Sequence, residues 1–238
     1  MCYHYSLSKK LEEIIKATGL NWESDFEPMY HTIGFNFPYM PVITSEKKDT
    51  VQLYQWGLIP HWVKSLNDAD KIRTQTLNAK GETIFEKPSF RSYVQNRCIV
   101  LADGFFEWME FKKKKFPHYV HFNDFELFGL AGLYAHWVDK ESGELLRTFS
   151  IITTEANPLL ARVHNIKKRM PVILQKSQWN DWLQPNLTKD QITSFLQPCD
   201  DSTMKAYPIS KLITTRGADT NHPEIKEPYT YAELTSGE

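Results

Sequence analysis

The sequence predicts a single β-rich α+β domain, with antiparallel, barrel-like strands and peripheral helices. Many segments are apolar or alternate between apolar and polar residues, and turn residues separate them, which is typical of antiparallel strands. The helical patterns between these segments are short. The chain of 238 residues carries 41% hydrophobic residues, so it is long enough to bury one substantial core. We therefore expect one domain over residues 1–230, followed by a polar tail over residues 231–238.

The first half of the chain predicts one helix among strands. Leu11, Ile14 and Ile15 fall on one face of a helical wheel, and Gly19 supplies a stop signal. Prolines and aromatic residues then favour strand pieces joined by a rigid loop. The expected elements are, in order, an opening strand, a helix at 11–19, strand pieces with a loop at 38–41 within residues 30–41, a β-rich run that ends at Pro60, and two helical pieces within residues 78–97 broken at Pro88.

The second half predicts mostly long strands. Asp103 and Gly104 separate two apolar segments, and the lysine run at 112–115 is typical of a hairpin tip. The expected elements are, in order, strands on both sides of Asp103-Gly104, strands at 116–122, 126–138 and 145–156, a helix at 157–165, a strand at 170–174, short helices around 179–183 and 188–196, and a last strand near 204–210.

Charge and cysteine content limit the class of protein. The formal net charge of −1 argues against a protein coated with basic residues, although a local basic groove is compatible with it. Cys2, Cys98 and Cys199 are odd in number and lack a C-x-x-C spacing, so we expect neither a disulfide framework nor a cysteine zinc site. No apolar run is long enough to span a bilayer. We expect a cytoplasmic protein with no membrane contact, metal or cofactor.

Cys2 directly follows the initiator methionine. A residue beside a chain terminus is ordinarily a solvated end with little structural demand on it. Removal of Met1 would instead leave Cys2 with a free α-amine beside its thiol, a 1,2-aminothiol. The amine titrates near ~7.7–8.0 and a thiol near ~8.5, so both groups are partly nucleophilic close to neutral pH. Cys2 is therefore a candidate nucleophile.

Three polar residues are candidates for proton transfer and orientation. Glu107, in the aromatic segment GFFEW, either faces solvent or is desolvated, with a raised pKa that suits a general acid or base. His164 precedes a basic cluster at 167–169, which suits a site that handles phosphate, although an isolated histidine is more often structural. Asn78, in LNAKGE, is expected at a helix start, where its ordinary role is an N-cap.

Two tryptophans, Trp56 and Trp62, lie close together in QWGLIPHW, beside Pro60 and His61. Tryptophans grouped in this way ordinarily belong to a hydrophobic core. The alternative is an exposed platform on which nucleic-acid bases stack.

Several short stretches follow one another along the chain in a fixed order. They are Met-Cys at the start, WGLIPxW at 56–62, N-A-x-x-E-T at 78–83, GFFEW at 104–108, TTEAN at 153–157, His164 followed by RMPVIL at 169–174, and NHPEI at 221–225. Any one stretch is weak evidence, whereas the ordered set with a cysteine at position 2 is specific and covers nearly all of the chain. On these motifs the chain resembles the SOS response-associated peptidase family, the SRAP domain.

The resemblance implies a crosslinking enzyme that shields abasic sites in single-stranded DNA during the SOS response to DNA damage. The α-amine of Cys2 would attack the open-chain aldehyde of the abasic sugar to give a Schiff base, and the thiol would then close a thiazolidine ring. The Schiff base is also compatible with AP-lyase activity. The implied partner is single-stranded DNA with abasic sites, including junctions with duplex DNA. The protein would act as a monomer in the cytoplasm, associated with the bacterial nucleoid when bound to DNA.

The resemblance also implies roles for individual residues. Glu107 resembles the glutamate that holds the amine and transfers its proton, and His164 resembles the histidine that assists opening of the sugar ring. Asn78 resembles the asparagine that orients the crosslinked residue and the sugar. The positions that resemble the family's DNA contacts are Lys80, Arg169, Trp56, Trp62, Pro41 in the loop at 38–41, Thr153, Thr154 and His4.

Three features depart from the family pattern. Tyr3 and His4 stand where the family commonly has Gly-Arg, and a neutral histidine contacts phosphate only weakly. Lys80 stands where arginine is usual, which keeps the charge and loses the bidentate fork. The residues N-I-K-K separate His164 from Arg169, a longer stretch than the family's usual spacing.

Two other functions are compatible with parts of the sequence. The N-terminal cysteine could act as the nucleophile of a thiol peptidase, the activity that the family name records. A noncatalytic module that binds single-stranded DNA would need only the aromatic residues and lysines. That second alternative leaves Cys2 unexplained.

Overall fold

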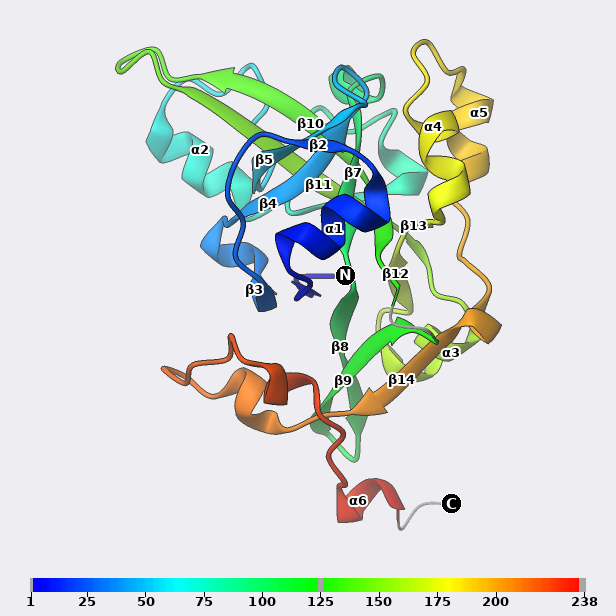
Figure 1. Cartoon of the computed structure of the whole chain (residues 1–238). Helices are drawn as coiled ribbons and strands as arrows, with labels where there is room; N and C mark the ends of the chain where they lie inside the picture. Colours follow the sequence, from blue (N-terminus) through cyan, green and yellow to red (C-terminus); the bar gives the residue numbers. More distant parts are fainter. Residues whose placement is uncertain (1, 124–125, 236–238) are drawn as a thin grey trace.

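The computed structural model describes residues 2–123 and 126–235, and its largest part is a closed β-barrel (Figure 1). The barrel strands are β4 (Tyr39–Thr44), β5 (Thr50–Trp56), β7 (Arg97–Ala102), β10 (Phe128–Val138) and β11 (Leu145–Glu155). Antiparallel pairing runs from β5 through β4, β7 and β10 to β11, and β11 then pairs with β5 in parallel. The expected β-rich, barrel-like α+β fold is confirmed.

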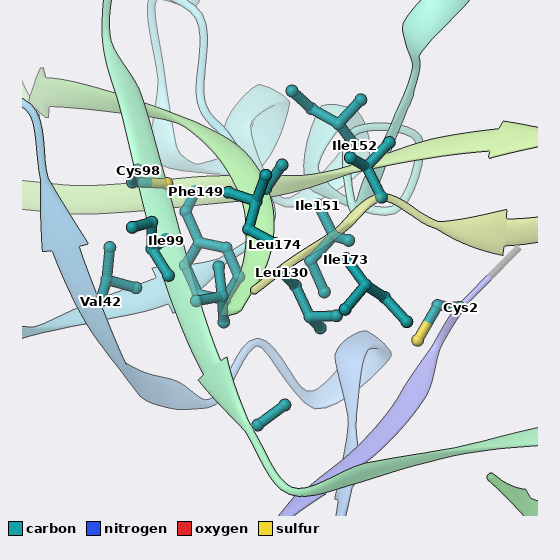
Figure 2. Close-up of a cluster of buried hydrophobic side chains, with 14 of the residues drawn as sticks. Cys2, Val42, Cys98, Ile99, Leu130, Phe149, Ile151, Ile152, Ile173 and Leu174 are labelled. Atoms are coloured by element: carbon teal, nitrogen blue, oxygen red, sulfur yellow. The ribbon is translucent and has the colours of Figure 1, made fainter. Parts of the chain in front are cut away.

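Apolar side chains fill the space between the barrel strands (Figure 2). Val42, Ile99, Leu130 and Phe149 come from four different strands, and each is at most 1% exposed. Packing is close enough that a Cβ atom at Gly132 would lie 2.8 Å from the sulfur of Cys98. The glycine on β10 therefore allows neighbouring strands to approach around the core.

A second sheet of five antiparallel strands continues from the barrel (Figure 1). Its strands, in spatial order, are β14 (Met204–Pro208), β9 (Lys114–Phe122), β8 (Gly104–Phe111), β1 (His4–Leu7) and β3 (Met29–Ile33). β7 leads into β8 through Asp103, so the chain passes there from the barrel to the second sheet. The expected hairpin tip is confirmed, because Lys112 and Lys113 join β8 to β9 with positive φ angles of 49° and 62°.

Four short strands extend the barrel wall. They are β2 (Asn21–Trp22), β6 (Asn78–Lys80), β12 (Arg169–Pro171) and β13 (Ile173–Leu174). β6 pairs with β11 in parallel and β12 pairs with β11 antiparallel, while β2 pairs with β5 and β13 with β10. The pairings of β6 and β12 bring two motifs that are far apart in sequence to the same strand, β11.

The helices lie at the periphery, as expected (Figure 1). They are α1 (Leu11–Thr18), α2 (Leu66–Arg73), α3 (Pro158–Val163), α4 (Trp179–Trp182), α5 (Lys189–Phe195) and α6 (Ala232–Thr235). Gly19 ends α1 in the left-handed conformation, with φ 72°. Asn157 caps α3, because its side chain accepts a hydrogen bond from the backbone amide of Leu160.

The two helical pieces expected within residues 78–97 are absent from the structure. Asn78–Lys80 forms strand β6, which pairs with residues 151–153 of β11. The rest of this segment contains only short 3₁₀ turns, at Gly81–Thr83 and Arg91–Tyr93. Backbone pairing with β11 satisfies the hydrogen bonds of 78–80, so tertiary contacts override the local helical preference.

The β-rich run expected to end at Pro60 and the loop expected at 38–41 also differ from the structure. β5 ends at Trp56, and Tyr39 and Pro41 belong to β4 rather than to a loop. Proline has no amide hydrogen to donate. It is tolerated at position 41 because β7 pairs with β4 only from Val42 onward, so no backbone hydrogen bond to β7 is lost.

Part of the polar tail expected over 231–238 is ordered against the second sheet. Tyr231 is buried, its hydroxyl donates to the carbonyl of Ile209 at 2.6 Å, and its ring packs on Phe116. α6 follows directly. Residues 236–238 lie outside the described residues.

Candidate active site

Cys2 lies where the second sheet meets the barrel. It lies two residues before the start of β1, is fully buried, and belongs to the main hydrophobic cluster. Figure 2 shows it at one end of that cluster. The side-chain amide of Asn78 donates to the Cys2 carbonyl at 2.9 Å. Burial raises the pKa of the Cys2 thiol well above its usual range, and the nearby Glu107 carboxyl raises it further. The thiol is therefore protonated and held within the fold.

Glu107 is on β8 and only 3% exposed, in agreement with the desolvated alternative from the sequence. Burial raises its pKa to about 8. The carboxyl therefore exchanges a proton close to physiological pH, which suits a general acid and base.

His164 follows the last turn of α3 and is 8% exposed. Its Nδ1 lies 2.8 Å from the carbonyl oxygen of Arg169 and 3.6 Å from Oε2 of Glu107. Because burial lowers its pKa to about 4, the imidazole is neutral at pH 7. A carbonyl only accepts, so Nδ1 carries the hydrogen and Nε2 keeps the lone pair.

The longer stretch between His164 and Arg169 forms a loop that leaves His164 in the site. The Asn165 side chain accepts from the amide of Glu110 on β8 and donates to the carbonyl of the same residue, at 3.0 and 2.8 Å. Lys168 adopts the left-handed conformation, with φ 48°, and turns the chain into β12. The extra residues are therefore accommodated outside the contact between His164 and Glu107.

Asn78 and Lys80 lie on the same face of β6, because alternate residues of a strand point to one side. Asn78 is buried, whereas Lys80 is exposed. Among the described residues, Oδ1 of Asn78 is buried and has no hydrogen-bond partner. This oxygen can accept a hydrogen bond from a ligand next to Cys2, while Lys80 provides a positive charge at the surface.

Arg169, on β12, and Lys80, on β6, pair with the same strand, β11. Lys80 pairs with Thr153 and Arg169 with Glu155, and the Thr153 carbonyl accepts from the Arg169 guanidinium at 2.7 Å. Glu82 binds the same guanidinium with both carboxylate oxygens. No local sequence pattern indicates this ion pair, because the two residues come from separate motifs. Arg169 is positioned by it, and part of its charge is neutralised.

The position of Trp56 differs from the expectation that it contacts DNA. It is fully buried, donates its indole hydrogen to the carbonyl of Leu77 at 2.8 Å, and stacks on Phe149 inside the barrel. Its ring therefore cannot stack on a DNA base in this structure, and its role is in the core. Trp62, by contrast, is 46% exposed and remains available as a DNA contact.

Three further expected DNA contacts are also buried. Pro41 lies within β4, and the Thr154 hydroxyl donates to the carbonyl of Leu196 at 2.8 Å. Thr153 is fully buried and contacts Arg169 rather than the surface. These side chains shape the wall behind the site, and the structure does not present them to a strand of DNA.

His4 forms a pair that the sequence did not reveal. Its Nδ1 shares a hydrogen bond of 2.9 Å with Nε2 of His31, and Nδ1 of His31 shares one of 2.8 Å with the Thr220 hydroxyl. Burial lowers the pKa of His4 to about 4 and that of His31 to about 3, so both rings are neutral at pH 7. His4 therefore connects β1 to the C-terminal segment instead of supplying a cation for phosphate.

Metal ligation and membrane insertion find no support in the described ranges. No group of three or more His, Cys, Asp or Glu side chains within residues 2–123 and 126–235 is arranged to hold a metal ion. In the same ranges, no helix combines the length and the apolar composition that a membrane crossing requires.

Comparison with known proteins shows the family of this chain. The family model described as SOS response associated peptidase (SRAP) matches residues 1–216, and the chain belongs to this family. Abasic site processing protein YoqW of Bacillus subtilis is 36% identical over 233 residues, covering 95% of this chain and 99% of that protein. Abasic site processing protein HMCES of Xenopus tropicalis is 28% identical, covering 86% of this chain and 68% of that protein.

Solved structures show the same fold. A crystal structure of a protein from Bacteroides thetaiotaomicron superimposes with a TM-score of 0.90 and 41% sequence identity, covering 96% of this chain and all of that one. A crystal structure of a protein from Bordetella bronchiseptica, at 24% identity, has a TM-score of 0.74 and covers 88% of this chain. That second likeness concerns the fold alone.

Proposed function

We propose that this protein binds single-stranded DNA and crosslinks covalently to abasic sites through Cys2, after Met1 has been removed. The observation that carries the proposal is the arrangement around Cys2, whose carbonyl is held by Asn78 and whose thiol is within electrostatic range of Glu107. Family membership supports it, as do the names of YoqW and HMCES, which are abasic site processing proteins. The protein would act as a monomer in the cytoplasm and on the nucleoid.

The proposed reaction forms two bonds without any change of oxidation state. The Cys2 amine adds to the aldehyde carbon of the open abasic sugar, and the resulting carbinolamine loses water to give a Schiff base. Glu107, with a pKa of about 8, donates a proton to the departing hydroxyl. The Cys2 sulfur then adds to the same carbon of the protonated Schiff base, and the electron pair of the C=N bond moves to the nitrogen. The thiol proton returns to the Glu107 carboxylate, which restores the acid and completes a neutral thiazolidine.

His164 and Asn78 would assist this sequence at the sugar. The neutral imidazole of His164 keeps a lone pair on Nε2, so it can accept a proton from the ring-closed sugar as the aldehyde opens. The buried Oδ1 of Asn78 would accept a hydrogen bond from a sugar hydroxyl. The alternative of a thiol peptidase is less well supported, because such enzymes need a thiolate and burial raises the pKa of the Cys2 thiol.

A denaturing gel tests the proposal. Protein with Met1 removed is mixed with single-stranded oligonucleotides that carry either an abasic site or an intact base. We expect a heat-stable shifted band only with the abasic strand, and its complete loss in Cys2→Ala. Cys2→Ser should trap no heat-stable product, because serine lacks the thiol that closes the ring. Absence of a band with the processed wild-type protein would refute the proposal in favour of noncovalent binding.

A further inference from the structure

A cavity of about 660 Å³ extends from the active site along the second sheet. Its lining includes Glu107 and His164 of the active site, and residues 213–218 and 220 of the C-terminal segment. Its volume lies within the range of ~300–1,000 Å³ that is typical of ligand pockets. The cavity is thus large enough for a ligand group beyond the sugar that Cys2 would attack.

The charged residues that line this cavity are almost all basic. Lys115 comes from β9, Lys167 from the loop after α3, and Arg216 from the C-terminal segment, and all three are exposed. Among the described residues that line the cavity, the one carboxyl is Glu107, which is largely protonated at pH 7 because its pKa is about 8. Glu110 lies opposite Lys115 across the β8–β9 pair but does not line the cavity. Three cations gathered around the cavity favour an anion such as a phosphodiester.

Apolar and aromatic side chains line the cavity between these cations and the active site. Trp108, the residue after Glu107, is half-buried and packs edge-on against His4, with ring centroids 4.7 Å apart. Ile166, in the loop after α3, is 60% exposed although it is apolar. An exposed isoleucine and a tryptophan in the same cavity provide apolar surface on which a nucleobase can rest.

The far wall of the cavity is fixed to the second sheet. The Thr220 hydroxyl is hydrogen-bonded to Nδ1 of His31, and the Asn221 side chain accepts from the amide of Tyr30 at 2.8 Å. These bonds to β3 hold the segment that carries Arg216 in place, so the pocket is formed before a ligand arrives.

We propose that this cavity binds the nucleotide next to the abasic sugar on the same strand, with its phosphate on Lys115, Lys167 and Arg216 and its base on Trp108. The inference rests on the proposed function, because a strand whose lesion reaches Glu107 must continue into an adjacent space. These cations are separate from Lys80 and Arg169, which lie along β11. The strand is therefore gripped on both sides of the lesion.

The test compares Lys167→Glu/Arg216→Glu with the wild type in crosslinking to three strands. One strand carries the abasic site in the middle, and the other two end at the lesion, one on its 5′ side and one on its 3′ side. For the central lesion we expect the half-saturating DNA concentration to rise about tenfold at ~0.1 M salt. One of the terminated strands should bind the variant and the wild type equally, because it lacks the nucleotide that enters the cavity.

A matched control is Lys112→Glu/Lys140→Glu, which reverses two exposed lysines that do not line the cavity. It should behave as the wild type with all three strands. An equal loss with both terminated strands, or no loss with the central lesion, would overturn the inference. So would equal weakening by the control variant, which would indicate a general charge effect.

A second measurement separates this inference from the proposed function. Noncovalent binding of strands that contain a tetrahydrofuran analogue of the abasic site needs no aldehyde, so fluorescence anisotropy reports on the cavity even if no crosslink forms. We again expect the charge-reversed variant to bind one of the two terminated strands as the wild type does, and to bind the other more weakly. If the charge-reversed variant binds every analogue strand as the wild type does but loses affinity for poly-glutamate, the cavity is an acidic-peptide site and the inference fails.

Discussion

The barrel and the second sheet bury different kinds of side chain. Inside the barrel, Trp56 and Phe149 stack among aliphatic residues, and burial removes apolar surface from water. In the second sheet, Asp103, His31 and Glu107 are each less than 10% exposed, and each must be stabilised by specific partners or by a change in protonation. The difference indicates that the second sheet buries carboxyl and imidazole groups in addition to its own apolar cluster around Phe106 and Tyr119.

Two buried carboxyls, Asp103 and Glu107, show two ways to bury an acid. Asp103 accepts hydrogen bonds from the Ser6 hydroxyl at 2.5 Å and from the Ser8 amide at 2.8 Å, and Lys226 lies 3.9 Å away. Glu107 is instead kept protonated by burial at neutral pH. Asp103 is thus suited to holding β1 in place, whereas Glu107 is suited to exchanging protons beside Cys2.

The largest effect is expected when Trp56 is replaced in the barrel. Trp56→Ala should lower the free energy of unfolding by about 3–5 kcal/mol, because a fully buried indole is lost and a cavity remains. Urea denaturation measures this. Trp62→Ala, at an exposed position, is the control and should change stability by less than about 0.5 kcal/mol.

The same tryptophan tests whether the barrel contributes to DNA binding. Trp56→Phe should retain the crosslinking rate per folded molecule, whereas Trp62→Ala should weaken binding of the strand. Loss of crosslinking in folded Trp56→Phe would contradict the assignment of Trp56 to the core.

The second-largest effect is expected at Asp103. Asp103→Ala leaves the Ser6 and Ser8 hydroxyls and the largely buried Lys226 without their acceptor, so stability should fall by about 3 kcal/mol. Asp181→Ala, at an exposed position, is a matched control and should stay within about 0.5 kcal/mol of the wild type. A loss below about 1 kcal/mol at Asp103 would show that the network does not anchor β1.

The sequence predicted the parts of both regions that depend on local pattern. The long strands could be predicted, because apolar alternation persists over many residues, and so could the helix expected at 157–165, which forms α3. Strand β6 could not be predicted, because three residues carry too little pattern and only pairing with β11 fixes their conformation. Tertiary pairing also decides that Trp56 faces the barrel interior.

The candidate site shows the same division. Cys2, Glu107 and His164 could be selected by chemistry and family motifs, and the structure brings Glu107 and His164 within 3.6 Å. The contacts around these residues could not. His31, which bonds to His4, carries no motif signal, and the pairing of Glu82 with Arg169 joins two separate motifs. Lys115, Lys167 and Arg216 gather around one cavity from three distant segments.

Glu107→Gln tests whether the buried carboxyl of Glu107 is protonated in the folded protein. Its expected effect on stability is smaller than that at Asp103 and larger than that at Lys80. The folded pKa is about 8 and the reference value is 4.5, so between these values the folded state holds a proton that the unfolded state has lost. Stability of the wild type therefore decreases as pH rises through this window, by at most about 1.4 kcal/mol per pH unit. Relative to the wild type, Glu107→Gln should gain about 2 kcal/mol between pH 6 and 7.5.

Urea denaturation at several pH values measures this gain, and crosslinking should be strongly slowed in the same variant. Glu110→Gln on the same strand is a control. A stability difference independent of pH would show that Glu107 is ionised in the folded state, and its role as a proton donor would then have to be abandoned.

The smallest effect is expected at Lys80, which lies on the surface between the two regions. Lys80→Ala should leave stability unchanged, because its ammonium is exposed, whereas Asn78 on the same face of β6 remains bonded to Cys2. If Lys80 contacts one phosphate of a single strand, the slope of log affinity against log salt should decrease in magnitude by about 0.7. Anisotropy with the tetrahydrofuran strand at several salt concentrations measures the slope, and Lys140→Ala should leave it unchanged. An unaltered slope in Lys80→Ala would show that the DNA strand does not contact β6. The role of β6 would then be limited to positioning Cys2 through Asn78.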